Sequence, residues 1–246
     1  MNALILAAGY ATRLYPLTID RPKPLLAVNK RPIVEHIIER VVTLDGLEKI
    51  FVVTNRKFFM NFKNWSKNFY CSKPLEIIND KTTQNSTRLG AIGDMALAIS
   101  EKNIDDDLLV VAGDNLFDFA LEEFIEFAKN NGPAIGAYDL KDIKKAARFG
   151  VVSLDESKKI TSFQEKPPQP KSSIIALAIY FFPKRTLPYI NEYLNSSSKN
   201  DAPGYYIDWL SRKESVFGYV FNGTWYDIGD IASYKLARKD WARRVL

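Results

Sequence analysis

The first half of the chain alternates short apolar runs with segments in which apolar residues recur at helical spacing. Apolar runs of strand length lie at 2–8, 49–54, 75–78, 107–112 and 133–138. Between them, apolar residues spaced by three and four predict helices near 33–42, 58–69, 89–101 and 121–128. This alternation predicts an α/β fold, in which a Rossmann-like, mixed but mostly parallel sheet is flanked by helices.

The pattern changes after residue 140, where shorter strands follow one another. Two strands, 149–153 and 159–163, are separated by Asp155-Glu156-Ser157, which predicts a hairpin. The remaining predicted elements are a strand at 174–182, a helix around 206–212, a strand at 216–221 and a last helix with Tyr234, Ala237, Trp241 and Val245 on one face. Because no linker separates independent parts, we expect residues 1–246 to form a single domain.

Composition narrows the classes of partner. The chain has 46% hydrophobic and 26% charged residues and a net charge of +5 without any basic block, so neither disorder nor nucleic-acid binding is indicated. The N-terminal apolar run is too short to span a membrane, and we expect no membrane partner. Cys71 is the only cysteine, which excludes an intrachain disulfide and favours a cytoplasmic protein.

The first apolar strand opens into a loop that carries candidate chemistry. Gly9 leads this loop, Arg13 follows, and Lys23 stands farther along in Arg21-Pro-Lys-Pro. Backbone N–H groups beside a guanidinium and an ammonium can hold a polyphosphate. The spacing fits neither the three glycines of the dinucleotide fingerprint nor the Gly-Lys-Ser/Thr of an ATPase loop. A nucleotide bound through its phosphates is therefore the first ligand to consider.

Two stretches around this loop carry a family resemblance. Leu6–Thr18 followed by Arg21–Leu26 resembles the signature of the sugar-1-phosphate nucleotidylyltransferases, similar to the glucose-1-phosphate thymidylyltransferases and uridylyltransferases. The resemblance implies the fold of the nucleotide-diphospho-sugar transferases, with a nucleotide-binding half at 1–140 and a sugar-phosphate-binding half at 141–246. Since the chain ends soon after Asp230, we expect a short form without a β-helix or acyltransferase extension.

The implied activity is transfer of a nucleotidyl group from an NTP to a sugar-1-phosphate, which yields an NDP-sugar and pyrophosphate. The attacking phosphate is already anionic at neutral pH, so the reaction needs cations rather than a side-chain base. The single histidine, His36, is accordingly predicted to lie on a polar helix face or at an interface, without a catalytic role. The resemblance implies that Arg13, Lys23 and Asp114 are the catalytic residues.

The resemblance also implies a nucleotide site and a metal site. The expected nucleotide-binding residues are Leu6, Ala7, Ala8, Gly9, Arg13, Lys23, Gln84, Thr87, Gly90 and Asp114. Gly113-Asp114-Asn115 and Trp225-Tyr-Asp227-Ile-Gly resemble the two family elements that supply carboxylates to Mg²⁺, a cation that prefers oxygen ligands. We therefore expect Asp114 and Asp227 to be the metal ligands. Asp230 is instead expected to cap the last helix.

The sugar-phosphate site is implied by later elements of the same resemblance. Glu165 and Lys166 match a Glu-Lys-Pro element that binds sugar hydroxyls and phosphate, and Gly150 matches a glycine that approaches the sugar ring. Tyr180 completes the expected substrate-binding set. Two residues before it, Ala178 stands where the family commonly has glycine, and the alanine narrows the space for a sugar.

Several alternatives remain open at this point. The expected partners are dTTP, UTP or CTP and a sugar-1-phosphate, and the chain is expected to be a monomer or a homodimer. A cytidylyltransferase acting on a non-sugar phosphate such as phosphocholine is a close alternative, although it would not need Glu165-Lys166-Pro167. A catalytically silent regulatory module that binds a nucleotide is the alternative from a different class.

Overall fold

A computed structural model describes residues 1–197 and 201–242, which divide into two compact units. Unit 1 comprises Met1–Arg88, Val111–Ala120 and the described residues from Gly223 onward. Unit 2 comprises Leu89–Val110 and the described part of Leu121–Asn222. Each unit therefore collects segments that are far apart in the sequence, and the units do not follow a division at residue 140.

The sheet of unit 1 contains three parallel strands in the order β1 (Asn2–Leu6), β4 (Lys49–Thr54) and β5 (Leu75–Asn79). β1 and β4 are rich in Ile, Leu and Val because most of their residues are buried, as is usual for parallel strands. The carboxyl ends of all three strands open at the same edge of this sheet, and the glycine-led loop follows β1 there.

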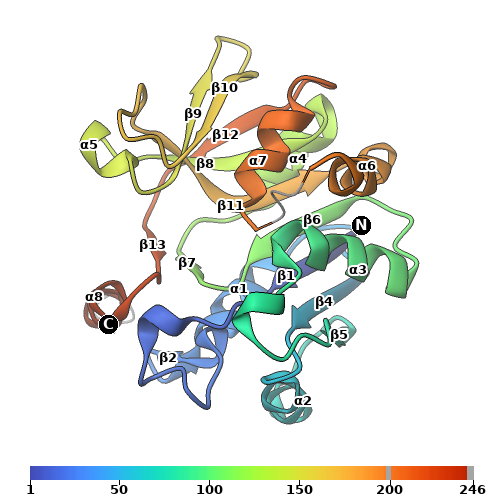
Figure 1. Ribbon diagram of the computed structural model, residues 1–246, viewed down its shortest axis with the longest axis vertical. Coiled ribbons are helices and arrows are strands. Elements are labelled where there is room, and N and C mark those ends of the chain that lie inside the picture. The colour runs from blue at the N-terminus through green and yellow to red at the C-terminus, as the bar shows by residue number, and fades with distance from the viewer. Residues whose placement is uncertain (198–200, 243–246) are drawn as a thin grey trace. The chain divides into compact units, whose positions relative to one another are not determined.

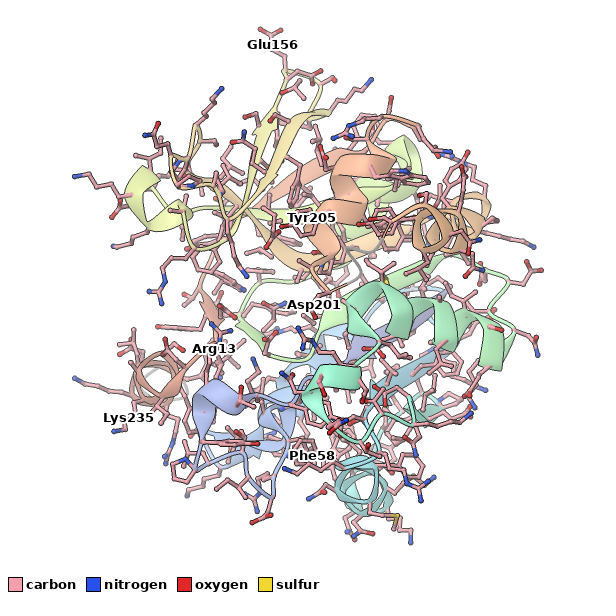
Figure 2. The ribbon with its side chains drawn as sticks, in the orientation of Figure 1. Arg13, Phe58, Glu156, Asp201, Tyr205 and Lys235 are labelled. Carbon is pink, nitrogen blue, oxygen red and sulfur yellow. The ribbon has the colours of Figure 1, made fainter. Side chains whose placement is uncertain are left out.

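Helices α1 (Ile33–Val41) and α2 (Phe59–Asn68) connect these strands. α2 packs against β5 (Figure 1). The side chains of Phe62 in α2 and of Phe58 immediately before it, labelled in Figure 2, are fully buried, so these aromatic residues belong to the core. Short 3-10 segments lie at η1 (Thr12–Leu14), η2 (Lys23–Leu25) and η3 (Asn85–Thr87).

Unit 1 also contains short elements that apolar periodicity does not predict. β2 (Ala27–Val28) pairs with β3 (Arg31–Pro32), and β7 (Asn115–Phe117) pairs antiparallel with β13 (Trp225–Asp227). The helix α8 (Ile231–Ala242) follows β13 and packs beside it and β2. Tyr234 and Trp241 are buried on its predicted apolar face, whereas Val245 lies outside the described residues.

His36 is buried in unit 1, so the prediction of a polar helix face is wrong. Its Nε2–H donates to the carbonyl oxygen of Val28 at 3.0 Å, and its ring meets the edge of Trp241 at 5.8 Å. Burial lowers the pKa of His36 against the opposing effect of this hydrogen bond. A neutral histidine satisfied by a backbone carbonyl is a structural residue that joins α1 to its neighbours.

The sheet of unit 2 is mixed. β9 (Gly150–Leu154) and β10 (Ile160–Glu165) form the predicted antiparallel hairpin, and β11 (Ile174–Phe182) runs antiparallel to β9 and to β8 (Ala134–Asp139). β12 (Phe217–Phe221) runs parallel to β8. β6 (Leu108–Ala112) begins in this unit and leads the chain out of it.

Helices cover this sheet. The helices of unit 2 are α3 (Gly90–Lys102), α4 (Glu122–Asn131), α5 (Ile143–Ala146), α6 (Pro188–Ser196) and α7 (Pro203–Leu210), with a 3-10 turn at η4 (Lys184–Thr186). α4 packs on β8 and β12, whereas α7 packs on β10 and crosses the front of the strands in Figure 1. The predicted α/β class, with a mixed sheet flanked by helices, is confirmed. In the described ranges, no helix has the length and apolar character needed to cross a bilayer.

Candidate functional site

Gly113 brings the turn after β6 directly against the end of β1. The N–H of Gly113 donates to the carbonyl oxygen of Leu6 at 2.8 Å. A Cβ at position 113 would lie 2.9 Å from that oxygen and 3.1 Å from Cγ of Pro24. Both distances are shorter than most contacts of real Cβ atoms. Glycine at this position therefore allows Asp114 to lie beside the segment that carries Lys23.

Lys23 and Asp114 form an ion pair. Nζ of Lys23 donates to Oδ2 of Asp114 at 2.5 Å, and the two side chains are 14% and 30% exposed. Pro22 and Pro24 flank the lysine at the start of η2 and restrict the backbone there. A charged hydrogen bond between half-buried groups fixes both side chains at one position.

The ribbon of β7 and β13 brings the second predicted carboxylate to the same place. Asp227 pairs with Asn115 in this ribbon, and the N–H of Ile228 donates to the carbonyl oxygen of Asp114 at 3.3 Å. The ring N–H of Trp225 donates to Oδ1 of the buried Asn115 at 2.8 Å, which secures the register. Two aspartates distant in sequence are thus neighbours in unit 1.

Arg13, labelled in Figure 2, completes this group from η1. A Cβ at Gly229 would lie 3.1 Å from Oδ2 of Asp227 and 3.9 Å from Nη2 of Arg13, so the backbone of Gly229 borders both groups. Burial, and next the negative charge of Asp114, raise the pKa of Asp227 to about 6, against the opposing charges of Lys23 and Arg13. We name Arg13, Lys23, Asp114 and Asp227 the cation–carboxylate cluster.

The donor set of this cluster fits a magnesium ion. Asp114 and Asp227 present oxygen ligands to one region, and their mutual repulsion would be relieved by a divalent cation. Within the described part of the chain, no group of three or more His, Cys, Asp or Glu side chains is arranged to hold a metal. Two carboxylates would therefore need phosphate oxygens or water to complete the shell, as Mg²⁺ commonly does.

Asp230 caps α8, as predicted. Its Oδ1 accepts from the N–H of Ser233 at 2.8 Å, while the hydroxyl oxygen of Ser233 accepts from the N–H of Asp230 at 3.0 Å. This reciprocal pair satisfies donors that the first helical turn leaves open. The carboxylate of Asp230 therefore serves as the cap of α8. Its negative charge also raises the pKa of Asp227, as the smallest of the causes of that shift.

Glu165 lies at the end of β10 in unit 2, between two glycines. It pairs with Gly150 in the hairpin, and a Cβ at Gly150 would lie 3.3 Å from its Oε2. A Cβ at Gly204 would lie only 2.3 Å from the same oxygen and 2.4 Å from the ring of Phe163. Gly204, at the start of α7, therefore closes over this carboxylate, and sequence reasoning missed it because nothing local marks the contact.

The Glu165 carboxylate is mostly buried and weakly paired. Its side chain is 13% exposed, and Nζ of Lys166 lies 3.7 Å from Oε1. Burial raises the pKa of Glu165, and the Lys166 charge opposes this rise. Lys166 itself has a positive φ of 46°, a conformation that side chains rarely adopt, and its N–H donates to the carbonyl oxygen of Phe149 at 3.0 Å. A bound hydroxyl could donate to the remaining lone pairs of Glu165.

In β11, Ala178 stands at the position where the family commonly has glycine. This residue has a φ of 53°, and the pairing of β11 with β8 shifts register between Ala176 and Tyr180. Such a bulge suits glycine, which explains why glycine would be favoured there. Tyr180 is buried and stacks on Phe182 at 6.0 Å, and its expected sugar contact stays a prediction.

The residues expected near the base lie outside the cation–carboxylate cluster. Gln84 and Thr87 are exposed in unit 1, where the hydroxyl of Thr87 donates to the carbonyl oxygen of Gln84 at 3.1 Å. Gly90 starts α3 in unit 2 with a φ of 78°, a conformation that favours glycine. Their roles in base recognition stay predictions.

Two curated proteins illustrate the sequence similarity of this chain to known proteins. It is 35% identical over 230 residues to the bifunctional protein GlmU of Methanocaldococcus jannaschii, which covers 93% of this chain and 51% of that protein. It is 30% identical over 235 residues to the mannose-1-phosphate guanylyltransferase catalytic subunit beta of Drosophila pseudoobscura pseudoobscura, with 93% and 59% covered. The chain thus spans about half the length of the curated relatives it matches.

Solved structures share the fold. A UDP-glucose pyrophosphorylase solved with UDP-glucose superposes with a TM-score of 0.83 over 99% of this chain and 98% of that chain, at 18% identity. A structure from Bacillus anthracis gives a TM-score of 0.83 at 25% identity, with 99% and 95% covered. The nucleotidyl transferase family model matches residues 2–244. This match over almost the whole sequence shows that the chain belongs to the nucleotidyl transferase family.

Proposed function

We propose that the chain catalyses Mg²⁺-dependent transfer of a nucleotidyl group from an NTP to a sugar-1-phosphate. The observation that carries the proposal is the cation–carboxylate cluster, in which Lys23 contacts Asp114, and Gly229 adjoins both Arg13 and Asp227. Family membership and the similarity to a mannose-1-phosphate guanylyltransferase support the same reaction class. The proposed arrangement is a single catalytic domain, with the triphosphate held by unit 1 and the sugar phosphate by unit 2.

The reaction balances without a side-chain base. An anionic oxygen of the sugar-1-phosphate attacks the α-phosphorus of the NTP, the new P–O bond forms, and the bond from the α-phosphorus to the bridging oxygen breaks. Pyrophosphate leaves with that electron pair. The barrier comes from bringing two anions together and from charge that develops on the α-phosphoryl and leaving oxygens, so positioned cations lower it.

The residues of unit 1 would divide this work. Asp114 and Asp227 would hold Mg²⁺, which when bound neutralises charge on the phosphate oxygens. Lys23, already fixed beside Asp114, would donate to phosphoryl oxygens of the NTP. Arg13 is exposed and carries a planar fork of donors, which suits the departing pyrophosphate.

Glu165 and Lys166 in unit 2 would bind the sugar-1-phosphate. A mostly buried carboxylate with its lone pairs largely unused gains most from hydroxyl donors, and the adjacent ammonium can hold the phosphate. The backbones of Gly150 and Gly204 adjoin this carboxylate, where any larger residue would place its Cβ against Oε2. This arrangement favours a sugar over phosphocholine, which has no hydroxyl to donate.

The activity is tested by pyrophosphate release from five NTPs, including GTP and ATP, against a panel of sugar-1-phosphates and phosphocholine. We expect release that depends on a sugar-1-phosphate and stops when EDTA removes Mg²⁺. Release with phosphocholine alone would favour the cytidylyltransferase alternative. Nucleotide binding without release under any condition would favour the silent regulatory module.

Asp114→Asn tests the role of the cluster. We expect a loss of kcat of about 100-fold or more, with the melting temperature kept near that of the wild type. Asp45→Asn is the matched control, because Asp45 is an exposed aspartate of the same unit. Activity of Asp114→Asn near that of the control would remove Asp114 from the mechanism.

A further inference from the structure

A buried polar network lies at the carboxyl ends of the three parallel strands of unit 1, beside the glycine-led loop. It contains Asp80 and Thr82 from the segment after β5 and Tyr10 from the loop itself. The three residues are between 5% and 8% exposed. None of them belongs to the cation–carboxylate cluster, and the proposed reaction does not account for them.

The network has a defined direction of hydrogen bonding. The hydroxyl of Thr82 donates to the Asp80 carboxylate, at 2.8 Å from Oδ1 and 2.9 Å from Oδ2, and the N–H of Thr82 donates to Oδ1 at 2.7 Å. A threonine hydroxyl has a single proton, and here it is directed to a charged acceptor. The hydroxyl of Tyr10, 3.1 Å from Oγ1 of Thr82, must therefore be the donor in that pair.

Backbone hydrogen bonds connect this network to the neighbouring strand end. The N–H of Arg56 donates to the carbonyl oxygen of Thr82, and the N–H of Asp80 donates to that of Thr54, both at 2.9 Å. From β4, the hydroxyl of Thr54 donates to the carbonyl oxygen of Ala7 at 3.2 Å. The amide of Asn55 donates to that of Ala8 at 2.9 Å. The loop after β1 is thus held at its start by β4.

Tyr10 attaches the loop itself to this network, and the hydroxyl of Thr18 donates to the carbonyl oxygen of Ala11 at 2.7 Å. Tyr10 stands between Gly9 and Ala11, and Ala11 adopts a positive φ of 49° immediately before the segment that carries Arg13. A residue held in that conformation needs support from its surroundings. The hydrogen bond from Thr18 supports Ala11 directly, and the phenol of Tyr10, fixed by a charged acceptor through Thr82, adds support one residue away.

We propose that Asp80, Thr82 and Tyr10 are positioning residues that hold the glycine-led loop, and with it Arg13, in the conformation that binds the triphosphate. The inference rests on the proposed function, because the NTP is the ligand of this loop. Burial raises the pKa of Asp80, and the hydrogen bonds from Thr82 oppose the rise, in keeping with a carboxylate retained for its hydrogen bonds.

The test uses the full chain with Tyr10→Phe, Thr82→Val, the conservative Thr82→Ser and the double variant Tyr10→Phe/Thr82→Val. Tyr70→Phe and Thr83→Val are the matched controls, because Tyr70 and Thr83 are exposed residues of the same unit. Calorimetry measures the binding of each NTP to the protein in the presence of Mg²⁺. Kinetics measure the KM values for the NTP and for the sugar-1-phosphate, and hydrogen–deuterium exchange follows the peptide that contains residues 7–14. The exchange measurement needs no nucleotide.

We expect Tyr10→Phe and Thr82→Val each to weaken NTP binding by about 10- to 100-fold, as displaced binding groups do. The KM for the sugar-1-phosphate should stay unchanged, and Thr82→Ser should bind NTP within about twofold of the wild type. The double variant should lose no more affinity than the single variant with the larger loss, because both changes break the same interaction. Amide exchange in the loop should rise in the same variants and in neither control.

Two results would overturn the inference. Either NTP binding stays at the wild-type level in Tyr10→Phe and Thr82→Val, or the losses of the two variants add in the double variant. Faster exchange with unchanged binding would leave the network a structural support only. If the wild type itself binds no NTP while the variants still show faster exchange in the loop, the network does support the loop but the proposed function fails.

Discussion

Two alanines of this protein occupy left-handed backbone conformations, Ala11 in the glycine-led loop and Ala178 in β11. A side chain in this region costs about 1–2 kcal/mol, because Cβ approaches the following carbonyl oxygen. Both residues adjoin segments to which we assign substrate binding. The strain at each is therefore sustained by the rest of the fold, as is common at functional sites.

Ala178→Gly should raise the free energy of unfolding by about 0.5 kcal/mol, because relief of strain exceeds the added entropy of the unfolded chain. Ala176→Gly, two residues away on the same strand without a positive φ, should instead lower it by about 0.5–1 kcal/mol. Urea denaturation of both variants measures the difference. Equal losses in the two would show that residue 178 carries no strain.

Glu165 gives a pH-dependent prediction at a single carboxylate. Because burial raises its folded-state pKa, ionisation opposes folding, and its contribution to stability is lost as pH rises through that pKa. Glu165→Gln should therefore raise the free energy of unfolding at pH about 8. The gain should shrink as pH falls toward the ordinary value of 4.5.

Chemical denaturation across this pH range measures the effect. The exposed hairpin residue Glu156, labelled in Figure 2, provides the control variant Glu156→Gln, which should show no such gain. Were Glu165→Gln less stable than the wild type at every pH, the carboxylate would have to stabilise the fold. Sugar-phosphate binding should fall in the same variant, so stability and function are expected to oppose each other at this position.

Helix α8 begins with the reciprocal cap between Asp230 and Ser233, whose contribution to stability can be measured. Asp230→Ala removes the acceptor for the N–H of Ser233 and should lower the free energy of unfolding by about 1 kcal/mol. Asp230→Asn keeps an acceptor of similar capping strength and should lose clearly less. Urea denaturation distinguishes the two, and equal losses would mean that charge rather than capping matters at this helix start.

Long apolar elements were predictable from the sequence, whereas short or polar ones were not. The strands 49–54 and 174–182 were predicted with the bounds of β4 and β11, because each is a nearly uninterrupted apolar run whose residues are mostly buried in β4 and in the second half of β11. β7 and β13 are too short to show periodicity, and their pairing depends on a Trp225–Asn115 hydrogen bond between distant segments. Helix α6 was missed because Asn, Glu and Ser interrupt its apolar pattern.

The cation–carboxylate cluster could be anticipated from motifs, but its supports could not. Arg13, Lys23, Asp114 and Asp227 were identified by resemblance, and the structure brings them together. The closure of Gly204 over Glu165 and the network around Thr82 have no local signal, because each depends on contacts between separate segments. Such contacts follow from tertiary structure, which single-sequence patterns do not contain.

The whole molecule carries a net charge of +5, and its proposed substrates are anions. Long-range attraction should therefore speed substrate capture, so kcat/KM should fall as the Debye length shortens from about 30 Å at 0.01 M salt to about 10 Å at 0.1 M. Initial rates at low substrate concentration measure this. The kcat at saturation should change little, and a parallel fall in kcat would indicate a salt effect on the fold instead.

Unit 1 draws on three stretches of the chain, and each stretch supplies part of the cation–carboxylate cluster. Arg13 and Lys23 come from the first stretch, Asp114 from the second and Asp227 from the third. Genetic recombination that replaced one contiguous block with its counterpart from a distant relative would bring in some members of the cluster and separate them from their original partners. Chimeras should therefore keep activity only where both parents place these four side chains alike, so the three stretches are expected to be inherited together between distant relatives.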